Sequence, residues 1–305
     1  MSDRPMVGLA LGGGFLRGTA HIGVLKVFRR AGIPVDMVAG TSAGSIMAAL
    51  YASGHSPEEM EKIALGLRHR DLFDYGPTLV NLLLIACDLL GQYTRLPVPG
   101  RRPLGLMKGA KLEAMLDRLL GKKRLLSETQ IPVGITAVDA RDGTLVVFRA
   151  GEDRERDTKG FTLVPPQDVY LRNVPLARAI RASIAVPGLF EPVKLEGRLL
   201  VDGGLRENVP SYVLRQMGAD LVIAVDVGYD GHRAHALDNI VDLLVQSLEI
   251  VSSESINLKL ERYADLLIRP VIKNMGSWDF GKVKYCIGRG EFAATNALDD
   301  IKKRL

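Results

Sequence analysis

The sequence predicts a single α/β domain, built as three α/β/α layers around a mostly parallel central sheet. The first observation behind this prediction is that short apolar strands alternate with amphipathic helices, the order that parallel βα units produce. The second is that the 305 residues contain no internal repeat, low-complexity linker or break in composition. We therefore expect one domain over residues 1–305, with a sheet covered on both faces.

The elements follow from apolar runs and from helical spacing. The predicted strands are Met6–Leu11, Val35–Ala39, Val133–Val138, Leu145–Phe148, Leu221–Val225 and Asp265–Arg269. The predicted helices are Gly18–Ala31, Ile46–Ala52, Lys111–Leu120, Leu237–Tyr263 and Glu291–Arg304. Another helix starts at Ser56, an N-cap followed by Pro57 and two acids. Asp142-Gly143 is typical of a hairpin turn.

Two segments are expected to be insertions on this domain, an apolar one at 75–103 and a polar one at 151–169. The apolar stretch Leu79–Leu90 is interrupted by Asn81 and Asp88, and it is shorter than the roughly 20 residues that cross a bilayer. One interpretation is a buried core helix or a subunit contact. The other is a lid or a membrane-docking element, helped by basic residues that follow it: Arg95, Arg101 and Arg102.

Composition limits the partners. The formal net charge is +5 and the isoelectric point is about 9.2, which suits contact with anionic surfaces. Aromatic residues make up only 6%, few for a protein that stacks on bases, so we expect no nucleic acid. Cys87 and Cys286 form no CxxC pair, and Met1–Gly8 does not resemble a secretory signal. These features predict a cytoplasmic protein that can associate with membranes, and they leave its oligomeric state open.

A glycine triplet, Gly12-Gly13-Gly14, follows the first predicted strand and precedes a helix. A dinucleotide fingerprint would need a glycine where Arg17 stands, although Asp36 would supply its acid. A P-loop would need Lys-Ser/Thr where Thr19-Ala20 stands. What remains is backbone N–H groups at a helix start beside a cation, an arrangement that stabilises a negative oxygen. The alternative is a tight turn without chemistry.

The pentapeptide Gly40-Thr41-Ser42-Ala43-Gly44 matches GxSxG between a predicted strand and a predicted helix. In this context the serine lies at a strained corner with its hydroxyl exposed, and the N–H of the next residue points to the same place. The flanking glycines allow the strand and the helix to approach each other. The pattern therefore predicts a nucleophile elbow at Ser42.

A serine nucleophile needs a base, and a histidine downstream of it is the usual choice. The histidines that follow Ser42 are His55, His69, His232 and His235. They lie after a helix end, in a basic run or in a polar loop, so none is a convincing base. His21 precedes Ser42 and belongs to the first predicted helix.

An aspartate fits the role of the base better. Asp202 ends an apolar strand and is followed by Gly203 and Gly204, which allow close approach. A carboxylate can act as a general base if burial raises its pKa. Asp142-Gly143 and Asp230-Gly231 have the same local pattern and are expected to be plain turns, so the residues alone do not rank the three aspartates.

Four ordered motifs resemble those of the patatin-like phospholipase family. They are the Gly12-Gly13-Gly14-x-x-Arg17-Gly18 loop, Gly40-x-Ser42-x-Gly44, the block from Arg181-Ala182-Ser183 to Pro187-Gly188-Leu189-Phe190, and Asp202-Gly203-Gly204 followed by Asn208-Val209-Pro210. The resemblance extends from Val7 to Pro210 and implies the patatin-like α/β/α fold.

The resemblance also implies an activity, the hydrolysis of lipid acyl esters such as phospholipids or lysophospholipids through an acyl-enzyme. It implies a catalytic dyad of Ser42 and Asp202. It implies an oxyanion hole formed by loop and elbow residues: Gly12, Gly13, Gly14, Arg17 and Ala43. It implies no metal and no organic cofactor. An acyltransferase with the same dyad and a catalytically silent lipid-binding module stay as alternatives, and a nucleotide-binding protein is weaker because both phosphate motifs fail.

Overall fold

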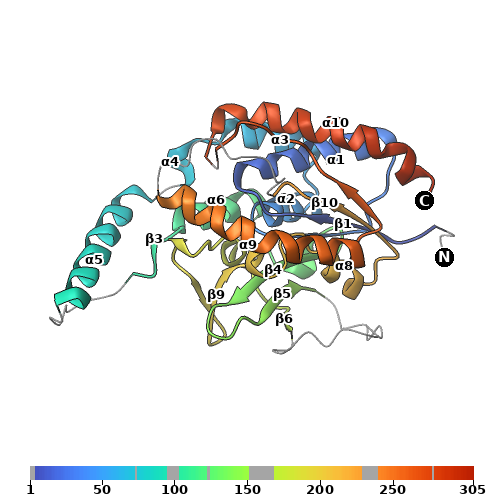
Figure 1. Cartoon of the computed structure of the whole chain (residues 1–305). Helices are drawn as coiled ribbons and strands as arrows, with labels where there is room; N and C mark the ends of the chain where they lie inside the picture. The colour runs from blue at the N-terminus through green and yellow to red at the C-terminus, as the bar shows by residue number, and fades with distance from the viewer. Residues whose placement is uncertain are drawn as a thin grey trace.

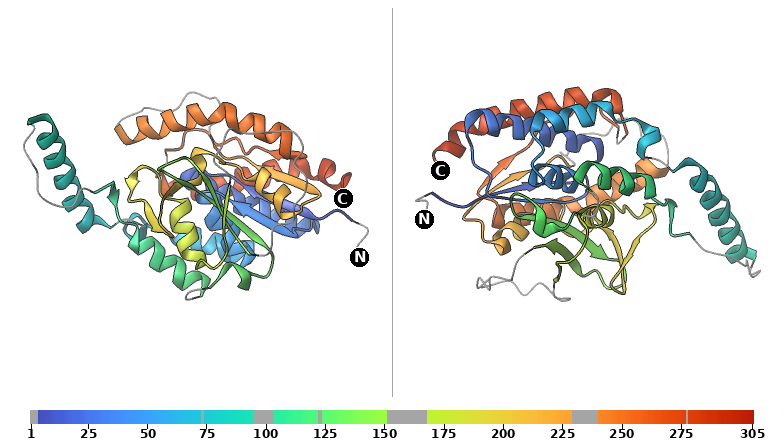
Figure 2. Two further views of the ribbon diagram at one scale, coloured as in Figure 1. Left: turned by 90° about the horizontal axis from the view of Figure 1, so that it is seen from below. Right: turned by 180° about the vertical axis from the view of Figure 1, so that it is seen from behind.

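The computed structural model describes residues 4–72, 74–94, 103–121, 124–150, 168–228, 240–276 and 278–305. A nine-stranded sheet lies between two layers of helices, as Figures 1 and 2 show, which confirms the predicted three-layer α/β/α class. The strands are β1 (Val7–Leu11), β2 (Met37–Gly40), β3 (Gly105–Met107), β4 (Val133–Asp139), β5 (Leu145–Arg149), β6 (Val169–Leu171), β7 (Gly188–Phe190), β8 (Val193–Leu195), β9 (Arg198–Asp202), β10 (Leu221–Val225) and β11 (Leu266–Ile268).

The α-helices in the described residues are α1 (Ala20–Ala31), α2 (Ala43–Ala52), α3 (Pro57–Gly66), α4 (His69–Leu72), α5 (Tyr75–Thr94), α6 (Ala110–Leu120), α7 (Leu176–Ser183), α8 (Ser211–Met217), α9 (Ile240–Tyr263) and α10 (Val283–Lys302). One layer contains α1, α2 and α10, and the other contains α8 and α9 (Figure 1). Alternate residues of β1 face the two layers: Leu9 packs in the first core and Ala10 in the second.

The centre of the sheet is parallel. The strand order is β11-β10-β1-β2-β4-β5-β6, and the five strands from β11 to β4 run in the same direction. β5 and β9 pair with β4 in the antiparallel sense, and β8 continues antiparallel from β9. A separate two-stranded sheet joins β3 to β7. The carboxyl ends of β1 and β2 therefore lie at one edge of the sheet, where the glycine triplet and Ser42 follow them.

The predicted strands all form, with ends that shift by one or two residues. The last helix is longer than predicted, because α10 begins at Val283 and not at Glu291. Glycines near its start argue against a helix, but Gly290 is needed where α10 crosses α1: a Cβ there would lie 1.9 Å from the Ala20 carbonyl oxygen. Close packing between helices outweighs the low helix propensity of glycine at this position.

The two predicted insertions have different outcomes. Nearly all of the polar segment 151–169 lies outside the described residues. Most of the apolar segment forms α5, and β3 begins just after its end. The interpretation of Leu79–Leu90 as a buried core helix is wrong, because five of its leucines and valines are more than half exposed: Leu79, Val80, Leu82, Leu83 and Leu90. Within the described ranges, no helix is both apolar enough and long enough to cross a bilayer.

Candidate active site

The edge of β4 brings the two predicted catalytic residues together. The first half of this edge pairs with β2, where Gly40 lies opposite Ile135. Two residues further along, the same edge pairs with β9, where Asp202 lies opposite Ala137. Ser42 follows the end of β2 and Asp202 ends β9, so the two side chains meet where β4 changes partner.

Ser42 occupies a strained backbone conformation, with φ 52° and ψ −124°. It is the N-cap of α2, which begins at Ala43. Gly44, in the first turn of α2, must be a glycine, because a Cβ there would lie 2.0 Å from the Leu11 carbonyl oxygen. The Ser42 N–H donates a 2.9 Å hydrogen bond to Oγ of Ser183, at the end of α7. These are the features of a nucleophile elbow.

Two buried threonine hydroxyl groups hold the backbone beside Ser42 in place. The Thr41 hydroxyl donates to the Glu207 carbonyl oxygen at 2.7 Å, and it lies 2.6 Å from the Thr136 hydroxyl on β4. Because Thr41 has a single hydroxyl proton, the Thr136 hydroxyl is the donor to Thr41. Both threonines are fully buried. This chain of bonds fixes the residue before Ser42 to β4 and to the loop that follows Asp202.

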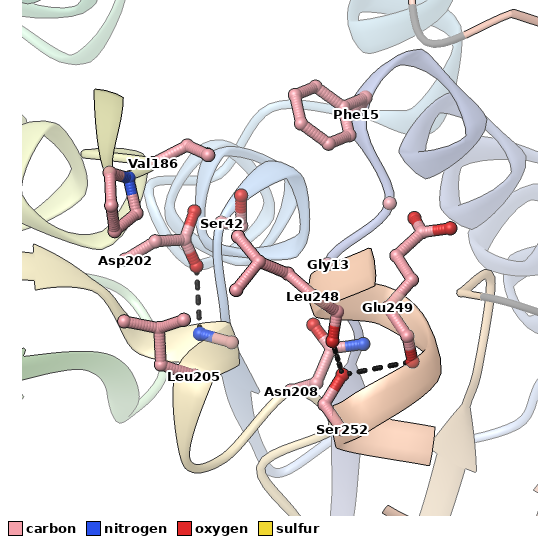
Figure 3. A pocket seen from close by; sticks show the side chains of 13 residues that line it. Gly13, Phe15, Ser42, Val186, Asp202, Leu205, Asn208, Leu248, Glu249 and Ser252 are labelled. Atoms are coloured by element: carbon pink, nitrogen blue, oxygen red, sulfur yellow. Dashed lines mark hydrogen bonds between the residues drawn. The ribbon is translucent and has the colours of Figure 1, made fainter. Parts of the chain in front are cut away.

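Asp202 is 6% exposed, and burial raises the pKa of its carboxylate to about 6. Two hydrogen bonds counteract part of this rise by stabilising the charged form: one from the Gly204 N–H at 2.7 Å and one from the Ser42 side chain. Figure 3 shows the Ser42 hydroxyl facing the carboxylate across the pocket. A carboxylate with this pKa is deprotonated at neutral pH and still basic enough to accept a proton.

The glycine loop is held by its own N–H groups. Gly12 donates to the Val225 carbonyl oxygen at 3.0 Å, and Gly13 donates to the Asn208 carbonyl oxygen at 3.1 Å. These two N–H groups therefore fix the loop and are not directed at a substrate oxygen, unlike the expectation from the sequence. Neither Gly14 nor Ala43 donates its N–H to another described residue. An anionic oxygen beside Ser42 would have these two donors.

The histidines do not supply a base within the described part of the chain. His21 is fully buried in α1, and its Nε2–H donates to the Gly12 carbonyl oxygen at 2.8 Å. Burial lowers its pKa to about 4, so it is neutral. His55 lies near the Leu50 carbonyl and His69 against Phe280, both away from Ser42. His232 and His235 lie outside the described residues.

Arg17 forms an ion pair. Its guanidinium contacts the Glu249 carboxylate of α9, and its Nε lies 3.4 Å from the Gly14 carbonyl oxygen. The sequence predicts that this cation biases the field at the glycine loop. In the structure Glu249 compensates most of its charge, so the bias is smaller than that of an unpaired arginine.

Two pockets meet at Ser42. The first has an empty volume of about 560 Å³ and contains polar groups from Ser42, Asp202, Asn208, Glu249 and Ser252, as Figure 3 shows. The second has an empty volume of about 930 Å³ and a mainly aliphatic wall from α2, α3 and α6. Phe15, Ser42 and Val186 line both pockets. No cluster of three metal-ligating side chains occurs among the residues that the structure describes.

Sequence reasoning missed the contribution of α9 and the roles of Ser183 and Asn208. α9 places Leu248, Glu249 and Ser252 at the pocket, although its sequence has no catalytic motif. Ser183 and Asn208 both lie in motifs that carry the family resemblance, which was the available signal. Their contacts are to backbone N–H groups more than 100 residues away, and a residue type does not reveal such contacts.

A solved structure with a similar fold is VipD from Legionella pneumophila. The two chains have a TM-score of 0.52 and 16% sequence identity, over 98% of this chain and 67% of that one. At this identity the similarity concerns the fold alone. It agrees with the three layers seen in Figures 1 and 2.

Sequence comparisons place the chain in a known family. The chain is 32% identical over 224 residues to a patatin-like phospholipase domain-containing protein of Caenorhabditis elegans, and 30% identical over 226 residues to an uncharacterized NTE family protein of Mycobacterium bovis. These alignments cover 73% and 74% of this chain but only 14% and 50% of the relatives. The model of the patatin-like phospholipase family matches residues 9–214, from β1 to α8, and the chain belongs to this family.

Proposed function

We propose that this protein hydrolyses lipid acyl esters, of the phospholipid or lysophospholipid class, through an acyl-enzyme on Ser42. The observation that best supports the proposal is the position of the Ser42 hydroxyl. It faces a buried carboxylate of raised pKa and lies where a pocket with several polar groups meets an apolar one. Family membership supports the same class of reaction.

Acylation would use Asp202 as the general base. The Ser42 Oγ attacks the ester carbonyl carbon while its proton moves to the Asp202 carboxylate. The oxyanion that forms accepts hydrogen bonds from the N–H groups of Gly14 and Ala43, the second being at the N-terminus of α2. Collapse of this intermediate breaks the bond to the alcohol, which takes the proton from Asp202 and leaves.

Deacylation would reverse these roles. Water gives its proton to Asp202 and attacks the acyl carbon, and the fatty acid leaves as Ser42 recovers the proton. If an alcohol replaced water, the same acyl-enzyme would make a new ester, and the protein would be an acyltransferase. Product analysis with and without an added alcohol separates the two activities.

The apolar pocket supports a lipid chain as the acyl group. Aliphatic side chains from three helices line it, and it opens at Ser42 and Ala43. A fatty acyl chain would lie in this pocket, and the alcohol portion of the lipid would lie in the pocket that contains Asp202 and Ser252. This arrangement directs the ester carbonyl to the Ser42 hydroxyl.

We also infer that the protein works in a reducing, cytoplasmic compartment and contacts anionic membrane surfaces. The positive net charge supports the contact with anionic lipid. The two cysteines are unpaired, and Cys87 is an exposed thiol, which fits a reducing environment.

The proposal is tested by labelling with a fluorophosphonate probe and by lipid hydrolysis. Ser42→Ala should abolish labelling, and Asp202→Asn should slow it strongly because the base is lost. Ser252→Ala is the matched serine control, since Ser252 lines the same pocket, and Asp142→Asn is the matched aspartate control in an exposed hairpin. Labelling that survives Ser42→Ala, or full activity of Asp202→Asn, would refute the assignment.

A further inference from the structure

α5 presents a stripe of apolar side chains to water and buries a polar one, Asn81, against the protein. Leu79, Leu83, Leu90 and Tyr93 are 65%, 67%, 63% and 88% exposed. With Ala86 they recur at spacings of four and three residues, which places them on one stripe of the helix. Asn81, on the opposite side, is buried. A helix on the surface of a water-soluble protein normally has the reverse pattern.

Polar contacts explain why this orientation is fixed. The Asn81 Nδ2 donates to the Gly105 carbonyl oxygen and to the Glu191 carboxylate, both at 3.1 Å. Just before α5, the Asp74 carboxylate accepts a 3.0 Å hydrogen bond from the Ala110 N–H at the start of α6. The buried amide ties α5 to β3, so the leucine face must point outward. Figure 2 shows that the helix extends away from the rest of the molecule.

An exposed apolar helix face of this kind normally binds a partner. Exposed apolar area costs about 25 cal/mol per Å², and contiguous patches of this kind mark interaction surfaces. The question is therefore which partner covers the leucine stripe (Leu79, Leu83, Ala86, Leu90 and Tyr93).

The position of α5 favours a lipid surface. The helix projects from the end of the molecule to which the carboxyl ends of the parallel strands point, opposite the N-terminus (Figure 1). Its base adjoins the apolar pocket at Ser42, because Leu72 of the preceding α4 lines that pocket and β7, the partner of β3, contributes Phe190. A lipid that leaves a bilayer beside α5 would reach the pocket without crossing another face of the protein.

The charge distribution also favours lipid. The sequence of α5 contains no lysine or arginine, whereas basic residues flank it on both sides. Arg68 and Arg70 precede the helix, and Arg70 is exposed. Arg95, Arg101 and Arg102 follow it in the sequence. An apolar helix preceded by exposed arginines is suited to the interface of a membrane, where the acyl region receives the leucines and anionic headgroups receive Arg68 and Arg70.

We propose that α5 is the membrane-docking element of this protein and that its leucine stripe inserts into the surface of an anionic bilayer. The proposal builds on the lipid acyl hydrolase function, since it assigns how that active site reaches a substrate in a membrane. Its test is chosen so that it does not depend on hydrolysis.

The experiment measures binding of Ser42→Ala protein to vesicles of phosphatidylcholine mixed with phosphatidylglycerol. Leu83→Glu and Leu90→Glu, made in that background, should each lower the partition coefficient about tenfold or more, because inserting one leucine contributes about 1.5–3 kcal/mol. Phe292→Glu on α10 is the matched control: Phe292 is 56% exposed on another element, and its replacement should leave binding unchanged.

Cys87 gives a direct second measurement. It is an exposed thiol on α5, whereas Cys286 is buried, so an environment-sensitive fluorophore should label Cys87 selectively. Its emission should shift to shorter wavelength on addition of the mixed vesicles, and this shift should be lost in Leu83→Glu and Leu90→Glu.

The outcomes separate docking from catalysis. Reduced vesicle binding supports docking by α5 even if no esterase activity is found. When the same leucine substitutions are made in the protein that retains Ser42, hydrolysis of a soluble short-chain ester should be unchanged. Equal vesicle binding by all variants overturns the proposal. So does a dimer in solution that Leu83→Glu dissociates while vesicle binding persists, because a second copy of the chain would then cover the stripe.

Discussion

The Arg17 guanidinium pairs with the Glu249 carboxylate where α9 borders the pocket that contains Ser42. Neither charge is deeply buried, since 18% of the Arg17 side chain and 17% of the Glu249 side chain are exposed. The pair is therefore close enough to the pocket to influence a charged substrate. The ion pair links the glycine loop, which follows β1, to α9, a helix of the layer that contains α8.

Replacement of Glu249 by glutamine should change the preference for lipid headgroups. Loss of the carboxylate leaves Arg17 unpaired, and its positive charge should favour an anionic lipid by about 0.5–1 kcal/mol, or roughly twofold to fivefold in KM. Steady-state kinetics on phosphatidylglycerol and phosphatidylcholine would measure the effect. Glu254→Gln, at an exposed position of the same helix, is the control for a general change in charge. Equal KM ratios in both variants would contradict the prediction.

Activity should fall as the pH drops below about 6. Burial raises the pKa of Asp202 to about 6, and only the deprotonated carboxylate accepts the Ser42 proton. We expect kcat/KM on a soluble ester to be constant above this pKa and to fall about tenfold per pH unit below it. Circular dichroism at each pH checks that the protein remains folded. Constant activity down to about pH 4 would exclude Asp202 as the base.

Asp202→Asn should stabilise the protein while it abolishes activity. The pKa of Asp202 is higher in the folded state than in the unfolded state. The free energy of unfolding therefore falls as the pH rises from about 4 to about 6, and it stays at the lower value above about pH 6. Since one pKa unit corresponds to about 1.4 kcal/mol, the neutral asparagine should add up to about 3 kcal/mol at alkaline pH. Urea unfolding at about pH 8 and about pH 4 measures this, with little difference expected at the lower value. If Asp202→Asn raised the free energy of unfolding equally at both pH values, the gain would have a cause other than the ionisation of Asp202.

Ser42→Gly should also raise stability. Serine with φ 52° and ψ −124° carries a backbone cost that glycine avoids, and the expected gain is about 1 kcal/mol after the larger chain entropy of glycine is included. Ser42→Ala is the matched control, because it removes the same hydroxyl and retains the Cβ that causes the strain. Thermal unfolding of the two variants should therefore differ, and identical midpoints would argue against strain at the elbow.

Ser183→Ala should reduce turnover more than substrate binding. The change leaves the Ser42 N–H without its acceptor inside the protein, at a cost of about 1–3 kcal/mol, and it releases the elbow from α7. We expect kcat to fall about tenfold or more, with KM little changed. Ser211→Ala tests the removal of a fully buried hydroxyl with no described partner and should have a small effect. A parallel rise in KM for Ser183→Ala would indicate general damage to the site.

The sequence predicts the fold and the position of Ser42 because both depend on local patterns. Strands such as Val7–Leu11 are short apolar runs, and the glycines around Ser42 are needed for local close approach. Asp202 is recognisable from its two following glycines, but its rank above Asp142 requires the pairing of β9 with β4. That pairing joins segments about 60 residues apart and has no local signal.

The sequence does not predict which backbone groups of the site form hydrogen bonds with each other. A glycine triplet indicates a tight loop, but not that Gly12 and Gly13 donate their N–H groups to Val225 and Asn208. The same holds for α9, whose apolar residues do not gather on one face, so its position over the pocket depends on tertiary packing. Long-range contacts decide these features.

The shared edge of β4 has a consequence for protein engineering. Because β2 and β9 both attach to this one strand, the spacing of Ser42 and Asp202 depends on strand register and not on the loops between them. The arm that contains α5 contacts the body through β3, which pairs with β7 and not with β4. Chimaeras that exchange this arm for the counterpart from a relative should therefore keep the geometry of Ser42 and Asp202. They should acquire the membrane preference of that relative, which would make the arm a replaceable module.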